Sequence, residues 1–242
     1  MPRALQEKST VEQIRKRFDS DVERFSKLED GQQAAMDAPI ILDIIARSAA
    51  SHLSPGGTVL DLGCGAGNFT LRVLSEVSPL DCVLVDLSRP MLERAELRVR
   101  AATTGRVQCI QSDMRSLSFQ SHSFDTILAG QTLHHLREDT EWEAMFAHFH
   151  DWLRPSGTLF VADLIAFDDP KIQQLMLGRY AEYLEKLGGI EYRDKVLAYC
   201  DEEDSPRSVK YQFDLLGKAG FSDFDILHKN GLFAAFYARK GP

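Results

Sequence analysis

The chain has 242 residues, of which 44% are hydrophobic and 26% are charged, and its formal net charge is -8. This length and composition suit one α/β domain that buries a core, and the acidic charge argues against a large nucleic-acid-binding surface. No apolar run is long enough to span a membrane, and the polar start, MPRALQEKST, lacks the apolar stretch of a signal peptide. We therefore expect a cytoplasmic protein with no nucleic-acid or membrane partner.

The cysteines show none of the spacings that are typical of metal sites. Cys64, Cys82, Cys109 and Cys200 include no CxxC pair. We expect reduced thiols that pack as small hydrophobic side chains, and no metal site.

The N-terminal part of the chain predicts two helices. The first covers residues 9–28, where Ser9 and Glu12 form a potential capping box and Phe18 and Phe25 belong to an apolar stripe. One interpretation is a solvated amphipathic helix docked on the domain. The other is a lid whose aromatic side chains, Phe18 and Phe25, close over a substrate pocket. A second helix is predicted over 40–53, so residues 1–54 would form a helical extension before the main domain at 55–242.

From residue 58 onward, predicted strands alternate with predicted helices, which indicates βαβ units and a mainly parallel sheet. After the first strand, further strands are expected at 82–86, 107–111, 124–129 and 158–162, and helices at 68–77, 90–102 and 140–153. Residues 164–206 then read as a helical insertion, with helices at 168–187 and 193–200 and an acidic run, 201–204, that is more typical of a solvated loop than of a metal site. A helix at 206–219, ended by Gly220, and two strands at 224–228 and 232–238 close the chain.

The stretch TVLDLGCGAGNFT at 58–70 predicts a ligand-binding turn between a strand and a helix. Gly63, Gly65 and Gly67 stand at alternate positions, whereas the dinucleotide-binding fingerprint has the spacing GxGxxG. Asp61 lies inside the strand, where a carboxylate would repel a pyrophosphate and favour an ammonium or sulfonium cation. A glycine-rich turn alone is weak evidence, because more than one cofactor class uses it.

Two more acids stand at predicted strand ends. Asp86 could accept hydrogen bonds from both ribose hydroxyls, and Asp113 could accept one from an adenine amino group, with the Met114 backbone beside the ring. Each acid alone could be an ordinary turn residue. Together with Asp61 and the glycine turn they favour one extended nucleoside that carries a positive charge.

These motifs resemble those of class I S-adenosylmethionine-dependent methyltransferases. The resemblance rests on VLDLGCGAG at 59–67, VDLSRPML at 85–92, QSDM at 111–114, FDTILAGQTLHHL at 124–136, LRPSGTLFVAD at 153–163 and LLGKAGF at 215–221. It implies a Rossmann-like α/β fold with seven strands in the order 3-2-1-4-5-7-6, the last antiparallel, and S-adenosylmethionine as the cofactor. It also implies contacts to that cofactor from Asp61, Gly63, Cys64, Gly65, Gly67, Asp86, Leu87, Met91, Asp113, Met114 and Gln131, with Gln131 facing the methyl group.

The C-terminal part is also similar to the carboxy-S-adenosylmethionine synthase family. DDPKIQQLMLGRY and EYRDKVLAY carry this likeness, which implies formation of a carboxylated cofactor from prephenate and an arginine, matched to Arg193, that holds the carboxylate. The glycine turn and the pair His134 and His135 follow the ordinary methyltransferase pattern instead. Methyl transfer is therefore the first prediction, and the synthase reaction, a nicotinamide-dependent oxidoreductase and a non-catalytic cofactor-binding subunit are the alternatives.

Candidate catalytic and substrate residues follow the later strands. His134 and His135, with Gln131, come after the fourth strand, and a histidine could act as a base near neutral pH or merely cap a turn. Asp163, after the fifth strand, is a candidate substrate contact or a structural residue.

The helical insertion at 164–206 is expected to cover the substrate. Its Tyr180 could line the pocket or pack in the core, and Arg179 and Arg193 could clamp a carboxylate or pair with surface acids. We expect a small acceptor, anionic or aromatic, and a monomer or a homodimer.

Overall fold

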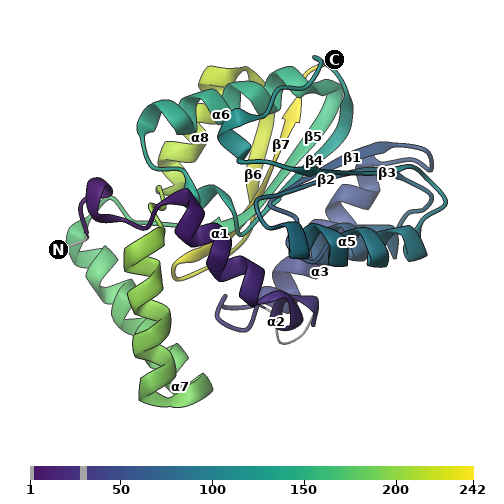
Figure 1. Ribbon diagram of the computed structural model, residues 1–242. Helices are drawn as coiled ribbons and strands as arrows, with labels where there is room; N and C mark the ends of the chain where they lie inside the picture. Colours follow the sequence, from purple (N-terminus) through teal and green to yellow (C-terminus); the bar gives the residue numbers. More distant parts are fainter. Residues whose placement is uncertain (1–2, 28–31) are drawn as a thin grey trace.

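The computed structural model describes residues 3–27 and 32–242, which form a seven-stranded sheet covered by helices on both faces (Figure 1). The strand order is β3-β2-β1-β4-β5-β7-β6, which confirms the predicted fold. Strands β1 to β5 pair in parallel, and β7 is antiparallel to both β5 and β6. The strands are β1 (Thr58–Leu62), β2 (Asp81–Asp86), β3 (Val107–Gln111), β4 (Phe124–Gly130), β5 (Leu153–Leu164), β6 (Phe221–Asn230) and β7 (Phe233–Lys240).

Two apolar clusters hold helices on opposite faces of the sheet. One face packs against α3 (Ala38–His52), α4 (Asn68–Leu74) and α5 (Arg89–Ala102), and the other against α6 (Asp139–Trp152) and α8 (Val209–Ala219). Trp142, Phe146, Phe149 and Trp152 of α6 are almost completely buried. Burial of such large aromatic side chains contributes strongly to stability. Within residues 3–27 and 32–242, no helix has the length and apolar character needed to cross a bilayer.

Local sequence signals place several helix ends where they were predicted. Ser88 caps α5, since its side chain accepts a hydrogen bond from the Met91 N–H, and Pro90 stands in the first turn. Gly220 ends α8 in the left-handed conformation, with φ 99°.

The predicted helix at 9–28 is divided in the structure. It forms α1 (Val11–Ser20) and α2 (Val22–Ser26), because Asp21 leaves the helical conformation, at φ -105° and ψ 10°. The capping box consists of Thr10 and Gln13 rather than of Ser9 and Glu12. The predicted end at Leu28 lies outside the described residues.

In the C-terminal half, α7 and β5 are longer than predicted. The long α7 (Pro170–Glu203) runs through both predicted helices and bends at Gly189, which has φ 83° and ψ 179°. The acidic run at its end is not a solvated loop, since Glu203 is 4% exposed and Asp204 is 7% exposed. Strand β5 begins directly after α6, and its antiparallel pairing with β7 continues to Leu164. In Figure 1, α7 extends away from the sheet, and α1 and α2 lie between α7 and α5.

Candidate active site

Two adjoining cavities lie at the ends of the parallel strands. The first is lined by the glycine turn, the end of β2, residues 112–115 and parts of α1 and α2. The second is lined by α1, α2, α7 and the turn after β4. Both are lined by Phe18, Phe25, Gln32, Gln131 and His135. The two cavities therefore meet at these five residues.

The glycine turn forms one end of the first cavity. Gly63 has φ 67°, and a Cβ atom on it would lie 2.2 Å from the Thr132 hydroxyl oxygen, so a side chain there has no space. Gly65 donates its backbone N–H to the Asp86 carboxylate at 2.7 Å. Gly63, Cys64 and Gly65 line the cavity, whereas Gly67 is the left-handed residue that begins α4.

Asp86 is the acid that faces the first cavity from the end of β2. It accepts backbone hydrogen bonds from Gly65 and Ser88, at 2.7 Å and 2.8 Å. Burial raises the pKa of Asp86 to about 6, although these hydrogen bonds oppose the shift. Leu87 and Met91 line the same cavity, and their contact with a nucleoside stays a prediction.

Asp61 has a different position from the other two acids. It is 1% exposed and accepts a hydrogen bond from the Thr70 hydroxyl at 2.6 Å. Burial raises the pKa of Asp61 to about 6. It does not line either cavity among the described residues, so its contact with the methionine amine stays a prediction.

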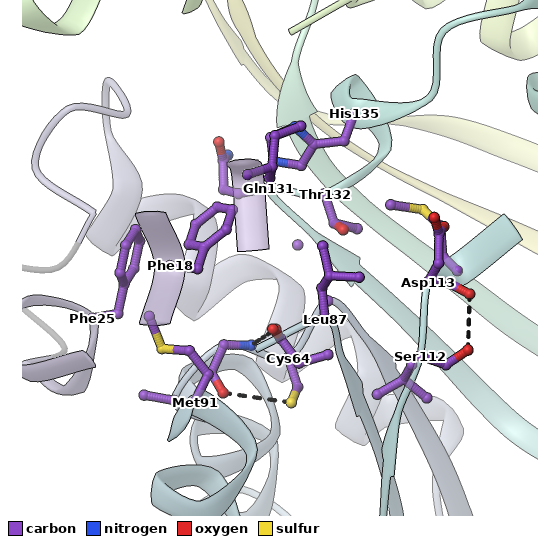
Figure 2. A pocket seen from close by; sticks show the side chains of 18 of the residues that line it. Phe18, Phe25, Cys64, Leu87, Met91, Ser112, Asp113, Gln131, Thr132 and His135 are labelled. Carbon is purple, nitrogen blue, oxygen red and sulfur yellow. Dashed lines mark hydrogen bonds between the residues drawn. The ribbon is translucent and has the colours of Figure 1, made fainter. Parts of the chain in front are cut away.

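Asp113 and Met114, which follow β3, line the first cavity. Figure 2 shows Asp113 beside Ser112. The Asp113 carboxylate accepts hydrogen bonds from the Arg115 side chain at 2.6 Å and from the Arg115 backbone at 3.0 Å. Although burial opposes the shift, Arg115 lowers the pKa of Asp113. A carboxylate oxygen can accept more than one hydrogen bond, so an adenine amino group could still bind there.

Gln131 and His135 lie at the shared wall, close to Phe18 in Figure 2. Gln131 has φ 55°, a left-handed conformation that is uncommon for residues other than glycine, and its N–H donates to the Ala162 carbonyl at 2.6 Å. Such backbone strain is often found at functional sites. The His135 ring meets the Phe18 ring edge to face at 5.8 Å between centroids.

His134 and Asp163 form a buried pair behind this wall. The Asp163 carboxylate bonds to the His134 Nδ1 and accepts the backbone N–H groups of His134 and Leu164, at 2.9 Å and 2.8 Å. Although burial would lower it, Asp163 and Asp204 together raise the pKa of His134 to about 9. A histidine held charged in this way is poorly suited to accept a proton at neutral pH. Asp163 itself is fully buried, and among the described residues it lines neither cavity.

The N-terminal helices cover both cavities and are tied to the domain on two sides. Arg17 of α1 binds the buried Glu203 through its Nε, at 2.7 Å, and through its Nη2. The Ser88 hydroxyl donates to Asp19 at 2.7 Å, and the Asn68 amide donates to the Phe25 carbonyl at 3.0 Å. The positions of Phe18 and Phe25 support the lid interpretation over the solvated helix.

The helical insertion lines the second cavity with aromatic side chains. These are Tyr180, Tyr192 and Tyr199 of α7. Arg193 binds Glu185 and Asp194, so it corresponds to the surface-pairing alternative, and the exposed Arg179 contacts Met176. Among the described residues, neither arginine lines either of these two cavities, which favours the surface-pairing alternative over the carboxylate clamp.

The arginines that do line the second cavity are Arg17 and Arg24. Neither was among the predicted site residues. The one signal that could have identified them is their position directly before Phe18 and Phe25, over which they stack with the guanidinium carbon 4.3 Å and 4.6 Å from the ring centroids.

Comparisons with known proteins agree with this geometry. Residues 59–157 match the family model described as the methyltransferase domain. The carboxy-S-adenosyl-L-methionine synthase of Wolinella succinogenes is 29% identical over 239 residues, which cover 96% of this chain and 97% of that protein. The protein of the same name from Nautilia profundicola is 23% identical over 98% of this chain and 100% of its own length.

Solved structures show the same fold. The [4+2]-cyclase SpnF aligns with a TM-score of 0.68 at 16% identity, over 97% of each chain. An S-adenosylmethionine-dependent methyltransferase from Methanosarcina mazei aligns with a TM-score of 0.57 at 18% identity, over 79% of this chain and 95% of that one.

Proposed function

We propose that this chain, an S-adenosylmethionine-dependent enzyme of the methyltransferase type, transfers a methyl group to a small molecule in the second cavity. The observation that carries this proposal is the wall shared by the two cavities, which includes Gln131 and His135. A cofactor anchored by the glycine turn and Asp86 would place its reactive end at this wall.

Bound S-adenosylmethionine supplies a methyl group on a sulfonium, which is an excellent leaving group. The protein then has to align the acceptor with the methyl group and exclude water. Gln131 and His135 offer hydrogen-bonding groups at the shared wall, and Phe18 and Phe25 cover it. We assign Gln131 and His135 to acceptor positioning.

The lining of the second cavity indicates the chemistry of the acceptor. Tyrosine side chains from α7 and phenylalanines from α1 and α2 surround it, and Arg24 lies at its edge with no hydrogen-bond partner for its buried Nε among the described residues. An aromatic acceptor that carries a carboxylate or a phenolate would match these groups.

Calorimetric titration with S-adenosylhomocysteine tests the cofactor site. We expect binding with a dissociation constant on the order of micromolar, and its loss in Asp86→Ala, because the ribose hydroxyls lose their acceptor. Asp225→Ala, an exposed residue of β6, is the matched control. Binding that is unchanged in Asp86→Ala would refute the assignment of the cofactor to the first cavity.

The synthase reaction is the second candidate, because the two curated relatives described above carry that name and match over nearly their whole length. The position of Arg193 does not support it, since this side chain pairs with acids of α7. Mass spectrometry of the ligand extracted from the native protein separates the two reactions. A cofactor heavier than S-adenosylmethionine by one carboxyl group would favour the synthase.

Cellular location and assembly remain as the sequence predicts them. We infer a cytoplasmic enzyme, either monomeric or homodimeric, that acts on a small molecule rather than on nucleic acid or at a membrane. The acidic net charge of -8 supports the absence of a nucleic-acid substrate.

A further inference from the structure

His134, His135 and Asp204 come together at the wall of the second cavity. The histidines belong to the short turn η3 (Leu133–His135) after β4, and Asp204 follows α7. The Asp204 Oδ1 lies 3.4 Å from the His135 Nδ1 and 3.7 Å from the His134 Nε2. All three residues line the cavity, and one ligand atom from each lies within 4.8 Å of the others.

The side chains of His134, His135 and Asp204 do not form hydrogen bonds with one another. An N–H···O hydrogen bond normally spans 2.7 to 3.2 Å, so the separation of 3.7 Å between His134 and Asp204 is too long for one. Both ring nitrogens of His135 are buried and have no hydrogen-bond partner in the part of the chain that the structure describes. An unpaired buried polar group is costly, which indicates that something else occupies the space between them.

The two distances from the Asp204 carboxylate to the imidazole nitrogens suit a shared metal ion. Nitrogen and carboxylate oxygen ligands lie about 2.1 Å from Zn²⁺, and tetrahedral geometry then places neighbouring ligand atoms about 3.4 Å apart. The observed separations of 3.4 Å and 3.7 Å are close to this value. Two imidazoles and one carboxylate form a ligand set that suits divalent transition metals.

Asp163 provides the supporting contact that such sites use. It binds the His134 Nδ1, which leaves the Nε2 directed toward Asp204, and two backbone N–H groups hold its own oxygens. A carboxylate that binds the second nitrogen of a histidine ligand fixes the ring and raises its basicity.

The charges are also suitable. Asp163 and Asp204 are two buried carboxylates, at 0% and 7% exposure. Without a metal, the charged His134 balances one of them, and a divalent cation that displaces the proton of the His134 Nε2 would balance both. Arg17, whose charge acts on Asp204, is already paired with Glu203.

We infer that His134, His135 and Asp204 bind a divalent transition-metal ion, with an open coordination position that faces the second cavity. Three protein ligands and one open position are typical of catalytic rather than structural metal sites. An oxygen, nitrogen or sulfur atom of the methyl acceptor could take the open position and be oriented by the ion. That role rests on the proposed function, whereas metal binding itself does not.

Cobalt binding to the tag-free, full-length protein tests this inference. After chelator treatment, Co²⁺ is added, and the visible absorption of low-coordinate Co²⁺ is recorded together with the metal content of the dialysed protein. We expect stoichiometric binding by the natural chain and a loss of at least about tenfold in affinity in Asp204→Asn and in His135→Ala. Asp163→Asn should weaken binding about 10- to 100-fold through the supporting contact. His52→Ala, which changes an exposed histidine of α3, is the matched control and should keep full binding.

Circular dichroism of the same samples shows whether each variant is folded, and binding of S-adenosylhomocysteine is measured separately. Asp204→Asn should keep it, because Asp204 does not line the first cavity. Equal Co²⁺ affinity in the natural chain and in both folded ligand variants would overturn the metal site, as would an equal loss in His52→Ala. Co²⁺ binding without any S-adenosylhomocysteine binding would support the metal site and overturn the proposed function. Binding of S-adenosylhomocysteine without any Co²⁺ binding would overturn the metal site and leave the proposed function standing.

Discussion

At the scale of single residues, Gly63 has no space for a side chain because its left-handed backbone directs the Cβ position into Thr132. We expect Gly63→Ala to lower the free energy of unfolding by on the order of 2 to 4 kcal/mol, from backbone strain and overpacking combined. Gly178 is a matched control, since it lies within α7 with nothing within 4 Å of its Cβ position. Gly178→Ala should raise stability by up to about 1 kcal/mol. Urea unfolding midpoints of the two variants check both values, and equal midpoints would contradict the expected clash.

The pKa of Asp86 predicts how cofactor binding depends on pH. Burial raises this pKa to about 6 in the free protein, so the carboxyl group becomes protonated as the pH falls through that value. A protonated carboxyl loses acceptor capacity for the two ribose hydroxyls, and affinity should fall by roughly tenfold per pH unit below about pH 6. Calorimetry with S-adenosylhomocysteine between about pH 5 and pH 7 measures this slope.

The variant Asp86→Asn identifies the group that titrates. Its affinity should be low and nearly constant over the same range, because an amide does not titrate there. The pKa of Asp61 is also raised to about 6 by burial. If the affinity of Asp86→Asn still fell with pH at the same slope, Asp61 rather than Asp86 would be the group that titrates.

At the scale of secondary-structure elements, α1 is held in place by the ion pair between Arg17 and Glu203. Loss of a hydrogen-bonded charged group typically costs about 1.5 to 3 kcal/mol. We therefore expect Glu203→Gln to open the N-terminal helices more often, with cleavage after Arg15 or Lys16 by trypsin at least about tenfold faster. Mass spectrometry of the early fragments gives the rate. Glu191→Gln, an exposed residue of α7, should leave it unchanged, and an equal acceleration there would show that the pair does not hold α1.

The elements also show which parts of the fold could be predicted. The first four strands and α5 are marked by local signals, such as the Ser88 cap, and their positions are right to within a residue or two. The extension of β5 to Leu164 depends on its pairing with β7, which no local pattern specifies. The interruption between α1 and α2 at Asp21 is likewise not marked by a local sequence signal.

The same reasoning explains which site residues could be predicted. Asp86 and Asp113 stand directly at strand ends, so the topology alone brings them to one edge of the sheet. Arg17 and Glu203 are 186 residues apart in sequence, and their meeting depends on how α7 returns to α1. The cluster of His134, His135 and Asp204 also depends on where the end of α7 packs. No local pattern specifies that position, so the acidic run at 201–204 resembles a solvated loop in the sequence.

At the scale of the whole molecule, α1 and α2 form one cover over both cavities, since Phe18 and Phe25 line each of them. We expect S-adenosylhomocysteine to slow amide hydrogen exchange in residues 11–26 as well as at the strand ends, because the ligand stabilises the closed cover. The edge strand β6 provides the internal control and should exchange at the same rate with and without ligand. Protection confined to the strand ends would mean that the cover does not contact the bound cofactor.

The single cover also has a consequence for the reaction cycle. If the chain transfers a methyl group as proposed, the same two helices cover both the used cofactor and the methylated product, and we expect neither to leave until the contacts of Arg17 and Asn68 open. Product release should then be slower than the chemical step, as in many enzymes with lids. A rapid-mixing experiment should show a burst of methylated product in the first turnover, followed by a steady rate that falls as solvent viscosity rises.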